Sequence, residues 1–253
     1  MKPLLAALII TKNNEETIKK TLESVKNFDE IVVVDSNSTD KTRDVVHKVL
    51  KVHKVYKVFL KSFEDIGKQR AYGLKYVSSE WVLILDSDEV APGKLIKEIK
   101  YRINDKSNNS AYEIPFQSYF LDRQLNFGGE DYCQLRLIKK DCVDILPSIV
   151  HNRFRIKKGK MAKLKEKIHH YSYRSLSQVY KKFTDYALKT AEIKAKKGER
   201  SSLKKIFLYP LHIFYARFIK DKGYKDGLFR IPLDTGFAYM EFLTYLLLFF
   251  RKK

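Results

Sequence analysis

The chain has 253 residues, of which 44% are hydrophobic and 32% charged, so it can bury a core and is not intrinsically disordered. Its 50 lysines and arginines outnumber its 30 aspartates and glutamates, which gives a formal net charge of +20. The 2 cysteines, Cys133 and Cys142, are too few for a disulfide framework or a four-ligand zinc site, and they favour a reducing cytosol.

Apolar runs rich in β-forming residues recur in the first part of the chain, with charged stretches of helical period between them. Because strand and helix alternate, we expect a parallel sheet covered by helices on both faces. The predicted strands are residues 4–10, 31–34, 55–60 and 81–85, and the predicted helices are residues 15–27, 39–50, 66–77 and 92–103.

After residue 103 the pattern changes to short alternating segments, which predict antiparallel or mixed strands. These segments are residues 111–116, 119–127 and 134–138. From Leu176 onward the period is helical, and Pro210 is expected to kink or divide one helix. One face of that helix carries Leu203, Phe207, Leu211, Phe214 and Phe218.

The simplest division is an α/β domain of residues 1–173 followed by a basic helical region of residues 174–253. Within the domain, the change of pattern after residue 103 separates residues 1–103 from residues 104–173. Residues 101–253 hold 32 basic and 15 acidic side chains, so this part is expected to face an anionic partner.

No segment is expected to span a membrane. The most apolar stretch, residues 237–250, is only 14 residues long and contains Glu241, whereas a bilayer needs about 20 residues. The first apolar run, residues 4–10, is too short for a signal peptide and lacks a small-residue cleavage site after it. Aromatic and basic residues near the C-terminus suit an element that lies on a membrane surface. The alternative is that these apolar faces pack on the catalytic domain or on a second subunit.

The strand predicted at residues 81–85 ends in three acids, Asp86, Asp88 and Glu89. Carboxylates this close repel one another unless a positive group lies between them, and a divalent cation is one such group. The alternative is that the acids cap the next helix, in which Pro92 suits the first turn. The sequence alone is compatible with a cation site and with a helix cap.

Asp35 ends the second predicted strand in the same way, and it could accept from a sugar hydroxyl or a base N–H. The alternative is an N-cap for the helix expected near Thr39. Residues 11–14 read Thr-Lys-Asn-Asn, so no glycine-rich fingerprint follows the first strand. A Rossmann dehydrogenase or a P-loop protein is therefore not expected.

Four segments in order resemble the motifs of the family 2 glycosyltransferases with the GT-A fold. They are residues 9–13 (IITKN), 30–40 (EIVVVDSNSTD), 67–73 (GKQRAYG) and 83–88 (LILDSD). Residues 134–138, 150–152 and 170–176 are similar to the bacterial lipopolysaccharide inner-core glycosyltransferases that add glucose to heptose. The resemblance covers nearly the whole chain. It implies a Rossmann-like, mostly parallel sheet flanked by helices, with a basic C-terminal helical appendage.

The resemblance also implies how the donor is bound, with residues 1–103 as the nucleotide-sugar half and residues 104–173 as the acceptor half. Thr11 and Asn13 would line the nucleotide pocket, and Asp35 would hold the uracil or the ribose. Arg70 would contact the diphosphate or the base, and Asp86 would approach the ribose.

A divalent cation, Mg²⁺ or Mn²⁺, is implied as the cofactor, with Asp88 as its ligand beside the two phosphates. Such a metal would act as a Lewis acid for departure of the nucleoside diphosphate. His170 matches a position where related enzymes bring a late histidine toward the metal or diphosphate. A histidine with structural contacts alone is the alternative.

An inverting transfer needs a base that takes the proton from the acceptor hydroxyl. In the resembling subgroup an aspartate stands two residues before the glutamine of a Gln-x-Arg element, but here Tyr132 has that place and the acid lies one residue earlier. We expect Asp131 to be the base, with Glu130 in reserve; a solvated loop is the alternative. Arg136 could bind the diphosphate or an acceptor phosphate, or pack in the sheet.

The predicted function is an inverting transfer of a hexose, expected to be glucose from UDP-glucose, to a lipid-linked saccharide such as the lipopolysaccharide inner core. The enzyme would be cytoplasmic and peripheral on the inner face of the cytoplasmic membrane, with an anionic membrane surface as a partner. Alternatives are another envelope polysaccharide or a glycoprotein as acceptor, an inactive membrane adaptor, or a nucleic-acid-binding protein. Nucleic acid is not expected, because the sequence has no recognisable motif for it and the acid cluster would repel phosphate without a metal.

Overall fold

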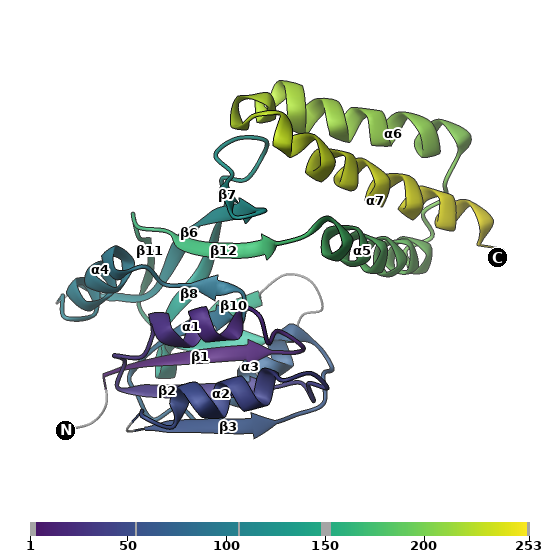
Figure 1. Cartoon of the computed structure of the whole chain (residues 1–253). Coiled ribbons are helices and arrows are strands. Elements are labelled where there is room, and N and C mark those ends of the chain that lie inside the picture. Colours follow the sequence, from purple (N-terminus) through teal and green to yellow (C-terminus); the bar gives the residue numbers. More distant parts are fainter. Residues whose placement is uncertain (1–3, 54, 106, 148–152, 252–253) are drawn as a thin grey trace. The chain divides into compact units, whose positions relative to one another are not determined.

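The computed structural model describes residues 4–53, 55–105, 107–147 and 153–251 (Figure 1). The motif noted at residues 150–152 lies outside them. Contacts divide the chain into an N-terminal unit, Met1–Phe116 with Tyr132–His170, and a C-terminal unit, Gln117–Asp131 with Tyr171–Lys253. The loop before Tyr132 thus groups with the C-terminal helices, whereas the sequence division at residue 173 groups it with the N-terminal domain.

The first half of the N-terminal unit alternates strand and helix, as predicted. The parallel strands lie in the order β3-β2-β1-β4; β1, β2 and β4 bury apolar residues on both faces, whereas the edge strand β3 is only partly buried. The elements are β1 (Leu5–Thr11), α1 (Ile18–Ser24), β2 (Glu30–Asp35), α2 (Thr42–Leu50), β3 (Tyr56–Leu60), α3 (Ile66–Lys75), β4 (Trp81–Asp86) and α4 (Gly93–Ile103).

Successive residues of the central strands enter two different cores. Val33 belongs to the core that contains the inner faces of α1, α2 and α4, whereas its neighbours Val32 and Val34 belong to the core beneath α3. Each fully buried side chain of this kind contributes about 1.5–3 kcal/mol. The continuous apolar runs in the sequence therefore mark strands covered on both faces, and they fix where the strand ends lie.

The sheet continues with antiparallel strands. β8 (Cys133–Lys139) pairs with β4, and β6 (Asn109–Phe120) pairs with β8. The full order is β3-β2-β1-β4-β8-β6-β12-β5, in which β5 is Glu89–Val90 and β12 is Ile168–Tyr173. Short strands β11 (Lys160–Lys163), β9 (Val143–Leu146) and β10 (Arg153–Ile156) complete the described sheets; β11 pairs with β6, and β9 with β10.

The strand predicted over residues 119–127 is wrong. β6 runs on to Phe120, and the chain then reverses so that β7 (Arg123–Gln124) pairs back on it. The two turn residues, Leu121 and Asp122, have φ of 49° and 59°. Positive φ at both central residues is typical of a type I′ turn. The Asn-Gly or Asp-Gly sequence that usually marks this turn is absent here, so the sequence did not predict the turn.

The C-terminal unit contains α5 (Leu176–Lys196), α6 (Leu203–Tyr215) and α7 (Ile231–Phe250). Ser175 and Ser202 cap the first two, accepting from the backbone N–H groups of Gln178 and Lys205. Pro210 was predicted to kink or divide this helix; it does not divide it, because α6 runs through Pro210 and continues into a π-helical turn at Ala216–Lys220. Packing of the inner face of α6 on α7 supports this continuous helix.

Among the described residues, one helical segment, Leu228–Phe250, is long and apolar enough to cross a membrane by length and composition. It is 23 residues long, so the apolar stretch predicted at residues 237–250 is only its C-terminal part. Its most apolar window is 33% buried. Core helices of soluble proteins share this length and composition, so this property alone does not identify a spanning helix.

Candidate active site

The carboxyl ends of three parallel strands bring predicted site residues to one edge of the sheet. Thr11 at the end of β1 lies in register with Asp35 at the end of β2, and Asp86 at the end of β4 lies opposite Ile10. In open α/β sheets ligands bind outside this edge. Sequence reasoning therefore placed these three residues together correctly.

Hydrogen bonds join the loops that follow β1 and β2. Asn13 has a φ of 51°, and its Oδ1 accepts from the Thr39 N–H at 2.8 Å. The buried carboxylate of Asp35 accepts from both the N–H and the hydroxyl of Ser38, at 2.7 and 2.6 Å. Asp35 thus orders its own turn and does not cap α2, because that helix begins later, at Thr42. The nucleotide roles of Asn13 and Asp35 stay predictions.

The loop after β4 is tied to the same edge through Ser87. Its hydroxyl accepts from Asn14 Nδ2 at 2.8 Å, and its carbonyl accepts from the Thr21 hydroxyl at 3.0 Å. Among the described residues Thr11 Oγ1 has no hydrogen-bond partner, although its side chain is buried. The nucleotide role of Thr11 stays a prediction.

Two buried arginines balance the acids at the end of β4. Arg70 on α3 forms an ion pair with Asp86 Oδ1, while Arg136 on β8 reaches Asp86 Oδ2 at 3.2 Å and Glu89 Oε1 at 2.5 Å. The second oxygen of Glu89 accepts from the Asp86 N–H at 2.9 Å. For Asp86 and Glu89 the positive group is therefore a pair of guanidinium groups, not the divalent cation suggested by the sequence.

The other interpretation, that the three acids cap the next helix, is wrong. Helix α4 has Pro92 at its N-cap, and no side chain in the described ranges caps it. Arg70 and Arg136 are 1% and 2% exposed, and the Arg136 guanidinium also lies over the Phe116 ring at 5.3 Å. Contact of either arginine with phosphate stays a prediction.

Asp86 and Glu89, the two acids that contact the buried arginines, differ in pKa. Burial raises the pKa of Asp86, but the charges of Arg70 and Arg136 outweigh burial and hold this pKa well below its usual range. Burial raises the pKa of Glu89 to about 7, and repulsion from Asp86 adds to burial while Arg136 opposes it. Asp86 is thus a permanent carboxylate at the sheet edge.

Asp88 and His170 lie together, as the prediction of a shared metal requires. His170 Nε2 is 3.4 Å from Asp88 Oδ2, and both side chains are about one-fifth exposed, at 20% and 22%. Pairing of β12 with β5 sets this contact, because His170 is in register with Glu89. The other ring nitrogen, Nδ1, lies 3.0 Å from the Tyr132 hydroxyl.

This pair fits part of a metal site. Two donor atoms bound to one small divalent ion lie about 3 Å from each other. The 3.4 Å between His170 Nε2 and Asp88 Oδ2 is close to that separation. Among the described residues no group of three or more His, Cys, Asp or Glu could hold a metal by itself. A cation here would thus need oxygens from the bound donor as well, which is common for Mg²⁺.

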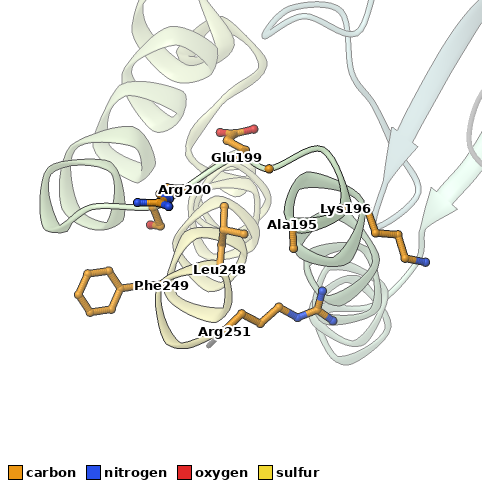
Figure 2. A pocket seen from close by; sticks show the side chains of 9 residues that line it. Ala195, Lys196, Glu199, Arg200, Leu248, Phe249 and Arg251 are labelled. Atoms are coloured by element: carbon orange, nitrogen blue, oxygen red, sulfur yellow. The ribbon is translucent and has the colours of Figure 1, made fainter. Parts of the chain in front are cut away.

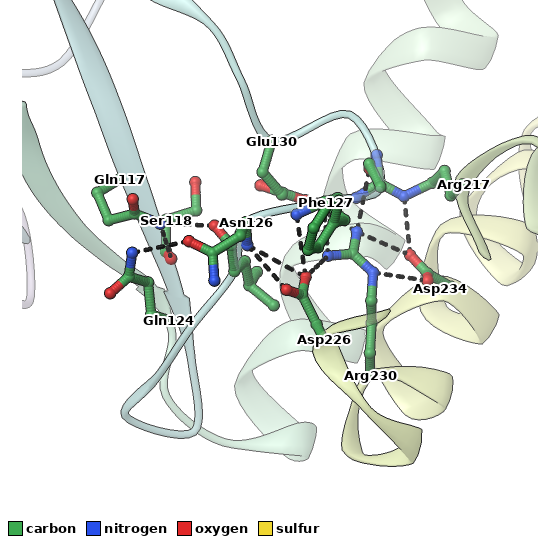
Figure 3. Close-up of polar contacts among 12 residues, drawn as sticks. Gln117, Ser118, Gln124, Asn126, Phe127, Glu130, Arg217, Asp226, Arg230 and Asp234 are labelled. Carbon is green, nitrogen blue, oxygen red and sulfur yellow. Dashed lines mark hydrogen bonds and ion pairs between the residues drawn. The ribbon is translucent and has the colours of Figure 1, made fainter. Parts of the chain in front are cut away.

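The candidate bases Glu130 and Asp131 belong to the C-terminal unit. Glu130 is 7% exposed and forms ion pairs with Arg217 and, at 3.4 Å, with Arg230; both arginines also pair with Asp234 (Figure 3). Asp131, the next residue, is exposed. The buried pairs give Glu130 a structural role, and the base assignment stays a prediction.

Arg230 also clamps the loop that precedes these acids. Its guanidinium donates to the carbonyl groups of Phe127 and Gly128, and a Cβ at Gly128 would meet Arg230 Nη2 at 2.1 Å (Figure 3). Asp226 accepts from the Asn126 N–H at 3.0 Å. Sequence reasoning missed this cluster, although the i,i+4 spacing of Arg230 and Asp234 was a signal for one of its pairs.

A cavity of about 810 Å³ lies elsewhere in the C-terminal unit, between the end of α5 and the end of α7 (Figure 2). None of the predicted site residues lines it. Its cations are Lys196, Arg200 and Arg251, and Leu248 and Phe249 supply its apolar wall.

The sheet order and the carboxylates at its edge are those of a GT-A fold. The model of glycosyl transferase family 2 matches residues 6–173, and the chain belongs to this family. It is therefore a glycosyltransferase, and the predicted fold class is confirmed.

Curated relatives agree with this assignment. An uncharacterized glycosyltransferase of Rickettsia conorii is 27% identical, and the alignment covers 94% of this chain and 87% of the relative. The lipopolysaccharide core biosynthesis glycosyltransferase LpsC of Rhizobium meliloti is 32% identical over 85 residues, which are 34% of this chain and 32% of LpsC.

Solved structures share the fold at low identity. The mannosyltransferase PcManGT of Pyrobaculum calidifontis, in complex with GDP-Man and Mn²⁺, has a TM-score of 0.53 at 14% identity, covering 94% of this chain and 74% of that one. Residues 1–349 of S. aureus TarS give a TM-score of 0.50 at 15% identity, covering 96% and 91%.

Proposed function

We propose that the protein is an inverting hexosyltransferase that moves glucose from UDP-glucose to a lipid-linked saccharide such as the lipopolysaccharide inner core. The observation that carries the donor half of this proposal is the Asp88–His170 pair beside Asp86, at the carboxyl edge of the sheet. These groups suit the diphosphate and ribose of a nucleotide sugar.

In this proposal the edge loops hold the nucleotide. Thr11, Asn13 and Asp35 would line the pocket for base and ribose, since Thr11 and Asp35 lie in register at the ends of β1 and β2. Arg70 and Arg136 keep Asp86 ionised and fixed, so that it can accept from a ribose hydroxyl without rearrangement.

Asp88 and His170 would hold a divalent cation together with the donor phosphates. When bound, Mg²⁺ or Mn²⁺ neutralises charge on the departing nucleoside diphosphate. The mannosyltransferase of similar fold was solved with GDP-Man and Mn²⁺, which supports a cation as the cofactor. Tyr132 would orient the His170 ring through its contact with Nδ1.

Asp131 would take the proton from the acceptor hydroxyl as that oxygen attacks the anomeric carbon. It is exposed, whereas its neighbour Glu130 is engaged by Arg217 and Arg230. An exposed carboxylate can approach an acceptor, and a buried paired one serves better to hold the loop. This difference supports Asp131 over Glu130 as the base.

A lipopolysaccharide acceptor is supported by the partial similarity to LpsC, and the surplus of positive charge in residues 101–253 suits a phosphate-rich lipid surface. We place the enzyme in the cytoplasm, peripherally on the inner face of the cytoplasmic membrane. There a soluble nucleotide sugar and a lipid-linked acceptor would both be within reach.

The donor is tested by thermal unfolding with UDP-glucose, UDP-galactose, UDP-GlcNAc and GDP-mannose, each with and without Mn²⁺. A donor at a hundred times its dissociation constant adds about 2.7 kcal/mol of stability. We expect the largest Mn²⁺-dependent shift with UDP-glucose, and loss of the Mn²⁺ dependence in Asp88→Asn. A larger shift with GDP-mannose would contradict the UDP-glucose assignment.

The acceptor is tested separately, by transfer of labelled glucose to purified lipopolysaccharide cores truncated before or after the first heptose. Product on the heptose-containing core alone supports the proposal. Donor hydrolysis without transfer to either core would point to a different acceptor.

A further inference from the structure

Helix α6 exposes an apolar surface on the side that faces away from α7. Six large residues of this surface are each between 45% and 67% exposed. Its opposite side is covered, since Ile206 packs with Tyr245 and Leu248 of α7. We define the α6 outer face as Leu203, Phe207, Leu208, Leu211, Tyr215 and Ile219.

An exposed apolar helix face of this kind normally contacts another protein or lipid. Not all of the apolar residues that the sequence placed on this helix face are exposed. Phe214 and Phe218 are half-buried and stack on each other, with ring centroids 5.4 Å apart. In the stripe at the end of α7, Tyr245 and Leu248 pack against α6, while Phe249 and Phe250 are exposed. The α6 outer face is thus the larger uncovered surface.

Basic residues outnumber acidic ones around this face, with Glu199 paired to Lys205 at its start and Asp221 directly after Lys220 at its end. Residues 200–220 contain no aspartate or glutamate. Lys204 and Lys220 lie exposed at its two ends, and the cavity beside the start of α6 adds Arg200 and Arg251. An apolar strip bordered by cations complements a bilayer that carries anionic headgroups.

The length of α6 decides how it would meet lipid. Together with the π-helical turn that continues it, the helix runs over residues 203–220 and extends about 27 Å, which is short of the roughly 30 Å hydrocarbon core of a bilayer. Helix α7 is longer, but Asp234 near its start is fully buried in ion pairs with Arg217 and Arg230. These features favour a folded unit that lies on a membrane surface over one that crosses the membrane.

We propose that the α6 outer face docks on an anionic lipid bilayer, with α6 lying parallel to the membrane surface. The proposal rests on the membrane location given above, but not on the identity of the donor or the acceptor. It places Phe207 and Leu211 in the acyl boundary and the neighbouring cations at the headgroups.

The experiment is co-sedimentation of the full chain with vesicles of equal parts phosphatidylglycerol and phosphatidylcholine, and with phosphatidylcholine alone. We expect binding to the mixed vesicles at low salt, and release as salt rises. The double variant Phe207→Glu with Leu211→Glu should bind at least about tenfold more weakly, because two apolar anchors become anions. Leu188→Glu, at a position on α5 that is 50% exposed, is the control and should bind like the wild type.

Donor hydrolysis measured on the same samples separates this proposal from the function proposed above. Unchanged hydrolysis in the double variant, with lost vesicle binding, supports docking through α6. Binding of the double variant equal to that of wild type overturns the proposal. So does a wild-type dimer that the double variant dissociates without any vesicle binding, because the face would then be an interface between two copies of the chain.

Discussion

The Tyr132 hydroxyl lies 3.0 Å from His170 Nδ1, and His170 Nε2 lies 3.4 Å from Asp88. Phe116 holds both rings, since it stacks on Tyr132 at 4.9 Å and meets His170 edge-on at 5.9 Å. A histidine that binds a metal needs its other nitrogen fixed in this way. Tyr132 occupies the position where the resembling glycosyltransferases have an aspartate. Here it contacts His170, the candidate metal ligand.

Replacing Tyr132 by phenylalanine keeps the stacked ring and removes the hydroxyl contact with His170. We expect the affinity for Mn²⁺ in the presence of UDP to fall about tenfold, with little change in the unfolding temperature. Electron paramagnetic resonance of free Mn²⁺ measures this directly. Tyr76→Phe, which removes a hydroxyl from a surface pair with Tyr72, is the control. Equal affinities in both variants would contradict the positioning role.

Removing Arg136 should destabilise the fold. Its guanidinium is 2% exposed and contacts both Asp86 and Glu89, so Arg136→Met leaves buried carboxylates with one cation fewer. We expect a loss of about 3–5 kcal/mol in the free energy of unfolding, measured with urea. The control is Lys139→Met on the same strand, whose ion pair with Glu80 is exposed and should contribute less than about 1 kcal/mol. Similar losses in the two variants would contradict the buried network.

The acids Glu130 and Asp131 should separate stability from turnover. Glu130→Gln weakens the buried pairs with Arg217 and Arg230 and should lower the free energy of unfolding by about 1.5–3 kcal/mol. Asp131→Asn should lower turnover about a hundredfold and change stability by less than about 0.5 kcal/mol. Urea unfolding and steady-state kinetics on both variants measure this. The reverse pattern would make Glu130 the base.

Glu30 should give the fold a dependence on acid. Burial raises its pKa, but hydrogen bonds from Lys57, Ser78 and Ser79 outweigh burial and lower the pKa below its ordinary 4.5. The unfolded chain therefore binds more protons, and the stabilisation is complete above pH 4.5 and lost as pH falls through the lowered pKa.

In Glu30→Gln this part of the pH dependence should disappear, so that urea midpoints fall less steeply below pH 4.5 than in the wild type. Glu23→Gln, at an exposed position on α1, is the control and should follow the wild-type curve. An unchanged slope in Glu30→Gln would show that another carboxyl dominates.

The sequence alone predicted the alternation of β1 to α4 and the strand ends that carry Thr11, Asp35 and Asp86, and it indicated the family. These properties are local. A strand buried on both faces reads as an apolar run, and the polar residues that end it mark the edge where ligands bind.

Tertiary structure alone decided what those residues contact. Arg136 reaches Asp86 because β8 pairs with β4, and His170 reaches Asp88 because β12 pairs with β5. Glu130 is buried because Arg217 and Arg230 converge on it, and the outer face of α6 is exposed because α7 covers only the other side. Periodicity gives the faces of an element but not the partners, since strand pairing and helix packing join residues far apart in the chain.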